Sequence, residues 1–239
     1  MFTTEAFNSV CGFALAALLA SSAPAEPMTG SDMIAIDVLI EPDAAMIDNA
    51  KEVNARLRQN YPDGYAFDSN HAPHITLVQR FVREGDLDAI ATSVSNALQS
   101  APALPLALTA TGYSADVWAG VGVVAYTVER SADLLELANR IEAALRPFSV
   151  SGGSANAFSK ADGEQINAET VKYVEAFVPA SSGQKYMPHL TLGTAHPDFA
   201  KALAAEPFKR FAFKGVKVEI FHLGNFGTAQ KKLWASKPQ

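Results

Sequence analysis

The five-residue pattern Pro-His-aliphatic-Thr-Leu occurs twice in the chain, in HAPHITLVQRF at residues 71–81 and in YMPHLTLGTA at residues 186–195. Each copy lies in an aliphatic and β-branched run, which predicts a β-strand. Because successive side chains of a strand point to opposite faces, His74 and Thr76 share one face. We therefore expect each copy to present an imidazole beside a hydroxyl, with its aliphatic residues packed behind them.

The second copy places His189 and Thr191 in the same relation. Two such strands side by side would line a cleft with two imidazoles and two hydroxyls. Histidine, with an unperturbed pKa of about 6.5, moves protons readily near neutrality. One ring can take a proton from a nucleophile while the other gives a proton to a leaving oxygen. The threonine hydroxyls can donate to the oxygens of a phosphate between the rings, and the scheme needs no metal ion.

The rest of the chain predicts an α+β fold. Apolar residues recur at strand or helix spacing, and turn residues separate the segments. We expect strands at 33–40, 74–81, 106–113, 121–128, 190–193 and 214–223, and helices at 43–59, 86–98, 131–145, 168–177 and 197–205. The glycine- and serine-rich stretch at 149–165 is predicted to be a loop, of a length typical of lids and binding loops.

Composition limits the classes of partner. The chain has 239 residues and a formal net charge of −6. Proteins that coat long nucleic acids carry a broad basic surface, so we expect no DNA partner. A small nucleotide or a short RNA end, with one or two phosphates, remains compatible with an acidic chain. We also expect a monomer without a cofactor.

The first 25 residues differ in character from the remainder. An apolar run from Val10 to Ala20 is followed by Ala23-Pro24-Ala25, the small-x-small pattern that precedes a signal-peptidase cut. We predict a signal peptide at 1–25, a single bilobal domain at 26–239, and a periplasmic or secreted protein without membrane attachment after cleavage. The alternative is a mis-assigned start, with a cytoplasmic protein beginning at Met28 or Met33.

The paired HITL (74–77) and HLTL (189–192) resemble the two signature motifs of the 2H phosphoesterase superfamily, in particular its 2′-5′ RNA ligase-like and cyclic phosphodiesterase members. The resemblance extends to the predicted order of elements from Met33 to Leu223. It implies two pseudo-symmetric lobes of antiparallel sheet and helices around a central cleft. It also implies a metal-independent phosphodiesterase that hydrolyses a 2′,3′-cyclic or 2′-5′ ribose phosphodiester.

The resemblance assigns roles to the motif residues. His74 and His189 would be the acid and the base, and Thr76 and Thr191 would bind the phosphate. We assign the base to His189 and the acid to His74 as a working hypothesis, which the sequence alone does not fix. Two neighbouring side chains are further candidates for substrate contact, with Tyr186 stacking on a base and Arg80 binding phosphate.

Two other functions stay open at this point. A non-catalytic nucleotide-binding module could use the same fold, since fold alone does not settle activity. A metal hydrolase could use His71, His74 and His189, although no metal-binding motif with usual ligand spacing is present and no carboxylate lies within either motif.

Overall fold

The computed structural model of the protein describes residues 32–68, 70–160 and 163–237, so the predicted signal peptide lies outside the described residues. Within them the chain forms one antiparallel sheet of seven strands with five α-helices, which confirms the predicted α+β class. The strands are β1 (Met33–Pro42), β2 (Ile75–Arg83), β3 (Leu106–Trp118), β4 (Val121–Val128), β5 (His189–Ala195), β6 (Phe211–Leu223) and β7 (Ala229–Ala235). The helices are α1 (Ala44–Asn60), α2 (Leu87–Leu98), α3 (Ala132–Leu145), α4 (Ala168–Ser181) and α5 (Pro197–Ala204).

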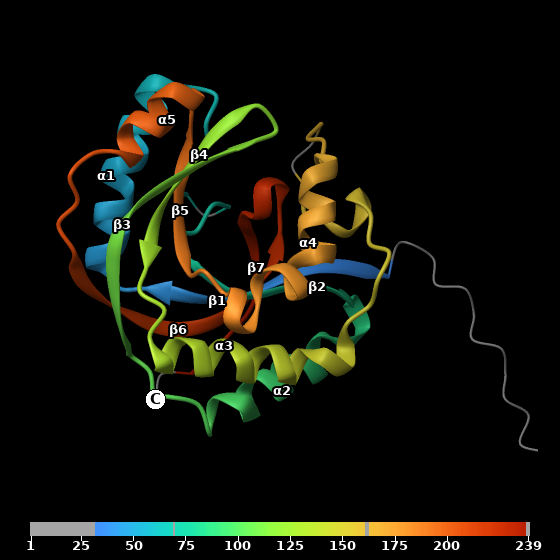
Figure 1. Cartoon of the computed structure of the whole chain (residues 1–239). Coiled ribbons are helices and arrows are strands. Elements are labelled where there is room, and N and C mark those ends of the chain that lie inside the picture. Colours follow the sequence, from blue (N-terminus) through green and yellow to red (C-terminus); the bar gives the residue numbers. More distant parts are fainter. Residues whose placement is uncertain (1–31, 69, 161–162, 238–239) are drawn as a thin grey trace, which may run out of the picture.

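The sheet brings its two edge strands together. Its strand order is β2-β1-β6-β3-β4-β5, with β7 paired to β6, so the two histidine motifs lie on opposite edges. These edges nevertheless contact each other, and the Tyr186 hydroxyl donates to the carbonyl oxygen of Thr76 over 2.8 Å. The sheet must therefore be strongly curved. In Figure 1, α1 and α5 lie beside β3, β4 and β5, whereas α2 and α3 lie beneath β1 and β2.

Local side-chain caps start three of the helices where the sequence predicts them. The carboxylate of Asp43 accepts from the backbone N–H groups of Met46, at 3.0 Å, and Lys214, at 2.8 Å, and so joins α1 to β6. Ser131 caps α3 and Asn167 caps α4 in the same way. Each cap satisfies a backbone donor that the helix itself leaves unpaired.

The sequence did not predict β7, because the lysines of AQKKLWA disguise a strand that pairs with β6 and exposes those side chains.

The described part of the stretch at 149–165 is a loop, as predicted, with one short 3-10 turn, and it packs against the sheet. Val150 N donates to the Phe81 carbonyl and Ser159 N to the Leu223 carbonyl, at 2.9 and 2.8 Å.

None of the helices within the described residues has the length and apolar character that crossing a bilayer requires.

Each histidine motif contains a β-bulge at the same place. In β2, Thr76 pairs with Leu39 and Val78 pairs with Val38, so Leu77 has no partner on β1. In β5, Thr191 and Gly193 pair with consecutive residues of β4, so Leu192 is the unpaired residue. A bulge inserts one residue and reverses which face the following side chains take. The repeat is therefore present in the structure as well as in the sequence, because a bulged leucine follows His-aliphatic-Thr in both copies.

The second bulge depends on a buried amide. Asn54, on α1, donates from Nδ2 to the carbonyl oxygen of Leu192 at 2.8 Å and to that of Tyr65 at 3.1 Å. Gly193 follows the bulge with a φ of 146°, and a Cβ there would lie 2.7 Å from Asn54 Nδ2. Glycine thus permits both the backbone conformation and the close approach of the amide.

We expect Asn54→Ala to destabilise the protein by about 1–3 kcal/mol, because it leaves two partly or fully buried carbonyl groups without their donor. Asn49→Ala is the matched control, since Asn49 is on the same helix and donates to Ala45 at an exposed site. Urea unfolding of the two variants measures the difference. Equal losses would show that the amide does not hold the bulge.

Candidate active site

The two motif histidines are held by the same backbone contact. His74 Nδ1 lies 2.7 Å from the carbonyl oxygen of Ala72, and His189 Nδ1 lies 2.9 Å from that of Met187. Because a carbonyl oxygen only accepts, Nδ1 must carry the hydrogen in both rings. In each motif a proline separates the histidine from the carbonyl that orients it. In the neutral form of each ring, Nε2 is therefore the basic nitrogen and is free for proton transfer.

A buried carboxylate lies beside the first histidine. Asp37, in the middle of β1, is fully buried, and its Oδ2 lies 3.5 Å from His74 Nε2. The same oxygen accepts from the Thr76 hydroxyl at 2.7 Å and from Gln79 Nε2 at 3.0 Å. Burial raises the pKa of Asp37, and the positive charges of His74 and, more weakly, His189 oppose that rise. Both histidines thus act on one carboxylate, as expected if β2 and β5 bring them to a common site.

The environment of the second histidine favours its neutral form. His189 is an exposed residue, yet enough protein surrounds its ring for desolvation to lower its pKa. The positive charge of His74 acts in the same direction, while the Met187 carbonyl and Asp37 act against it. A histidine that solvent can reach, but whose ring is partly desolvated by the surrounding protein, can contact a substrate and accept a proton from it.

The two threonines are not equivalent. Thr76 directs its single hydroxyl hydrogen to Asp37, so in this arrangement it has none to donate to a phosphate. Thr191 is half-buried, and no described residue forms a hydrogen bond with its hydroxyl. Of the two predicted phosphate contacts, only the Thr191 hydroxyl is free to donate.

Both predicted substrate-contact residues, Tyr186 and Arg80, have other partners in the structure. Tyr186 is 3% exposed, and its hydroxyl is bound to the Thr76 carbonyl, so it links β2 to the second motif and has no face for stacking. Arg80 forms an ion pair with Glu142 of α3 at 2.6 Å. Simple alternation would put Arg80 on the face of Thr76, but the bulge at Leu77 turns it to the helix-covered face. Gln79 takes the place on the site face that the sequence suggested for Arg80.

The third histidine of the metal-site alternative has other partners. The His71 ring stacks on Tyr65, with centroids 5.0 Å apart, and its Nδ1 lies 2.9 Å from Asp68 Oδ1. Among the residues that the structure describes, no three histidine, cysteine or acidic side chains gather closely enough to hold a metal ion. His71 itself lies in the loop between α1 and β2.

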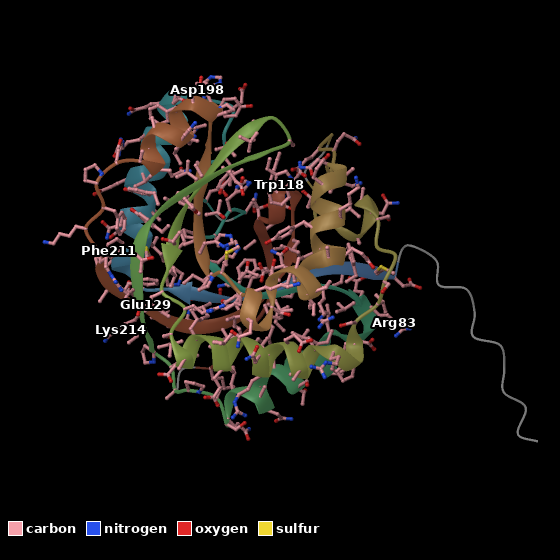
Figure 2. The ribbon with its side chains drawn as sticks, viewed as in Figure 1. Arg83, Trp118, Glu129, Asp198, Phe211 and Lys214 are labelled. Carbon is pink, nitrogen blue, oxygen red and sulfur yellow. The ribbon has the colours of Figure 1, made fainter. Side chains whose placement is uncertain are left out.

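Three half-buried aromatic rings form a cluster close to Gln79. Trp118, at the end of the β3–β4 hairpin, lies 5.2 Å from Tyr173 of α4 and 6.1 Å from Phe226, measured between ring centroids. Phe226 has a φ of 57°, a costly conformation for a bulky residue. A Cβ on the next residue, Gly227, would be in ordinary van der Waals contact with Gln79, at 3.5 Å from its Nε2, so this segment lies beside Gln79. Figure 2 shows Trp118 between the hairpin and α4.

Sequence reasoning missed Asp37 and this aromatic cluster. Asp37 had a visible signal, since it is the one charged residue within the otherwise apolar run MIAIDVLI. A carboxylate at a position that packing would fill with an aliphatic residue indicates a functional partner nearby. The aromatic cluster had no such signal. Its first and last members, Trp118 and Phe226, are more than a hundred residues apart in the sequence, and the three rings meet only in the folded chain.

Solved structures were compared with the chain. TT0787 of Thermus thermophilus is similar over 84% of this chain and 96% of that chain, with 12% sequence identity and a TM-score of 0.51. At this identity the likeness to TT0787 bears on the fold alone. E. coli LigT complexed with 3′-AMP gives 12% identity and a TM-score of 0.42 over 86% of this chain and 97% of that one. No curated protein sequence matches the chain significantly.

The sequence model of one family covers most of the chain. It describes the 2′-5′ RNA ligase superfamily and matches residues 44–225, a range that includes both histidine motifs and the bulges that follow them. The match confirms the resemblance that the motifs carry. The chain belongs to the 2′-5′ RNA ligase superfamily, within the 2H phosphoesterases.

Proposed function

We propose that the protein is a phosphodiesterase that hydrolyses a 2′,3′-cyclic or 2′-5′ ribose phosphodiester by acid/base catalysis with His74 and His189, without a metal ion. One observation carries the proposal. Two imidazoles on contacting edge strands have the same Nδ1–carbonyl bond, and each keeps Nε2 for proton transfer. A structural histidine has no reason to repeat both that bond and the bulge beyond it.

The reaction needs one proton to be taken and one to be given. A neutral Nε2 removes a proton from water as the water oxygen bonds to phosphorus. A protonated Nε2 on the other ring gives its proton to the ribose oxygen as the phosphorus–oxygen bond breaks. A 2′,3′-cyclic phosphate yields a ribose monophosphate, and a 2′-5′ linkage yields two fragments. Exchange of both rings with solvent restores the starting state.

The phosphate would lie between the rings, with the hydroxyl of Thr191 as a donor to one of its oxygens. The Thr191 hydroxyl is the free one of the two, and it shares a strand face with His189. Thr76 serves instead to link Asp37 to the first motif. A neutral hydroxyl and two imidazoles suit a single phosphodiester better than a polyanion, which agrees with the acidic net charge of the chain.

The aromatic cluster of Trp118, Tyr173 and Phe226 is the proposed platform for the nucleobase. Three rings from three separate elements meet there beside Gln79, which holds Asp37. Unstacked bases bind to such rings without sequence-specific hydrogen bonds. We therefore expect weak discrimination among bases, and this platform takes over the role that the sequence suggested for Tyr186.

His74→Ala and His189→Ala are each expected to lower kcat/KM for 2′,3′-cyclic nucleotides by about 10²–10⁴-fold, because each removes one proton-transfer group. His196→Ala is the matched control, since His196 is exposed at the start of α5 and its ring contacts Tyr61. Steady-state hydrolysis with and without a chelator measures the effect. Near-full activity in either motif variant would contradict the assignment, and zinc-reversible loss with the chelator would favour a metal hydrolase. Nucleotide binding without turnover by the wild type would indicate a binding module.

Trp118→Ala is expected to raise KM for a cyclic nucleotide about 5- to 150-fold, since stacking on one base is worth about 1–3 kcal/mol. Ribose 2,3-cyclic phosphate, which has no base, should show little change, and Trp118→Phe should restore most of the loss. The chain contains two tryptophans, so fluorescence in a Trp234→Phe background reports on Trp118 alone. Equal losses on both substrates, or no quenching by a nucleotide, would place the base elsewhere.

A further inference from the structure

We infer that Asp37 is a positioning residue that keeps the transferable proton on His74, and that it thereby makes His74 the acid and His189 the base. The inference rests on the proposed phosphodiesterase function and deepens it. The two motifs repeat each other, so sequence alone gives no reason to assign different roles to the two rings. The residues that face them from the neighbouring strands supply the difference.

The strand register shows which residues correspond in the two halves. His74 directly precedes β2, in which Thr76 pairs with Leu39 and Gln79 pairs with Asp37. In β5, Thr191 pairs with Ala125, and the residue equivalent to Gln79 is Thr194, which pairs with Val123. Asp37 and Val123 therefore occupy the same position, each two residues before the partner of its motif threonine. One half of the molecule has a carboxylate where the other half has a valine.

The contacts of Asp37 direct its charge at the first motif. Both of its hydrogen bonds, from Thr76 and Gln79, end on Oδ2, and His74 Nε2 lies 3.5 Å from that oxygen. Oδ1 is buried without a hydrogen-bond partner among the described residues. The carboxylate thus has few groups to offset its charge, and a protonated His74 is the nearest cation.

Burial of the carboxylate couples its charge to the proton on His74. A buried charge without a partner is strongly unfavourable, so an ionised Asp37 favours a cation at the Nε2 atom of His74, 3.5 Å from its Oδ2. The 3.5 Å separation exceeds a good hydrogen bond, and Oδ2 already has two donors. The proton on Nε2 is therefore stabilised by charge without being tied to the carboxylate, and it can pass to a leaving oxygen.

The other groups near Asp37 do not replace this partner. His189 acts on it more weakly than His74. Tyr173 of α4 and Tyr186 lie within its field, and burial, together with the charge of Asp37, raises the pKa of both phenols, so these side chains stay neutral. Desolvation lowers the pKa of His189, which keeps its ring neutral and basic near neutral pH. Opposed environments for two titratable groups are how one site holds an acid and a base together.

The test compares Asp37→Asn with Thr76→Val on two substrates. Asp37→Asn removes the charge at nearly constant shape, whereas Thr76→Val removes the hydroxyl and keeps the charge. The first substrate is a 2′,3′-cyclic nucleotide, whose ribose oxygen must be protonated as it leaves. The second is a nucleoside 3′-(4-nitrophenyl) phosphate, whose leaving group departs as a stable anion and needs no acid.

For the cyclic nucleotide we expect Asp37→Asn to lower kcat/KM about tenfold or more, because its leaving oxygen needs the proton of His74. The nitrophenyl ester should lose much less. Thr76→Val, which keeps the charge of Asp37, should not discriminate between the two substrates in this way. Equal losses of Asp37→Asn on the two substrates, or the same discrimination in Thr76→Val, would overturn the inference. Failure of the wild type to cleave either substrate would instead contradict the proposed function.

Circular dichroism and thermal melting show whether Asp37→Asn folds. If it does not, the same comparison is made with His74→Ala and His189→Ala, which retain Asp37. The inference then predicts that only His74→Ala keeps substantial activity on the nitrophenyl ester, because that substrate needs a base and no acid. Substantial activity of His189→Ala on the nitrophenyl ester, or loss of that activity in both variants, would contradict the assignment of roles.

Discussion

The candidate site depends on a hydrogen bond that each motif histidine makes to the backbone just before its own strand. Nδ1 of His74 and of His189 donates to the carbonyl two residues earlier, across a proline that restricts the backbone between them. This bond fixes the tautomer, points Nε2 away from the strand and removes most of the freedom of the ring. Proton transfer between fixed groups needs such pre-organisation, because a misplaced ring costs rate. In both of its copies in this chain, the pattern Pro-His-aliphatic-Thr-Leu thus fixes one imidazole of the candidate site.

The two devices meet because the sheet is curved. The motifs lie on its opposite edges, and contact between β2 and β5 closes the distance, with the Tyr186 hydroxyl bound across the junction. The bulged leucines, Leu77 and Leu192, then decide which later side chains face the site. The two motifs share this geometry, but the proposed hydrolysis needs one acid and one base. Asp37 and its counterpart Val123 differ between the two halves, and we propose that this difference sets the roles of the two histidines.

Sequence periodicity predicted the order of elements well, and the bounds of most helices and strands differ from expectation by only a few residues. β7 was not predicted, because exposed lysines on an edge strand mask its alternation of apolar and polar residues. The motifs predicted that His74 and His189 come together, and their strands do contact each other, while the roles of these residues and of Thr191 stay predictions. Arg80 was wrong as a site residue because a bulge, which alternation cannot anticipate, turned it toward Glu142. Tyr186 was wrong as a stacking residue because its burial depends on contact between distant strands. The family followed from the motifs and the α+β class from the periodicity of the rest of the chain, whereas the difference between the two halves at Asp37 and Val123 required the strand register.

The central claim is that one phosphorus centre lies between two Nε2 atoms. A crystal structure with orthovanadate and a nucleoside tests it most directly, because vanadate adopts the five-coordinate geometry of the reaction. The account predicts a single vanadium centre with the Nε2 atoms of His74 and His189 both within hydrogen-bond distance of its oxygens. An anion bound to only one of these rings, or bound where neither ring reaches it, would contradict the account.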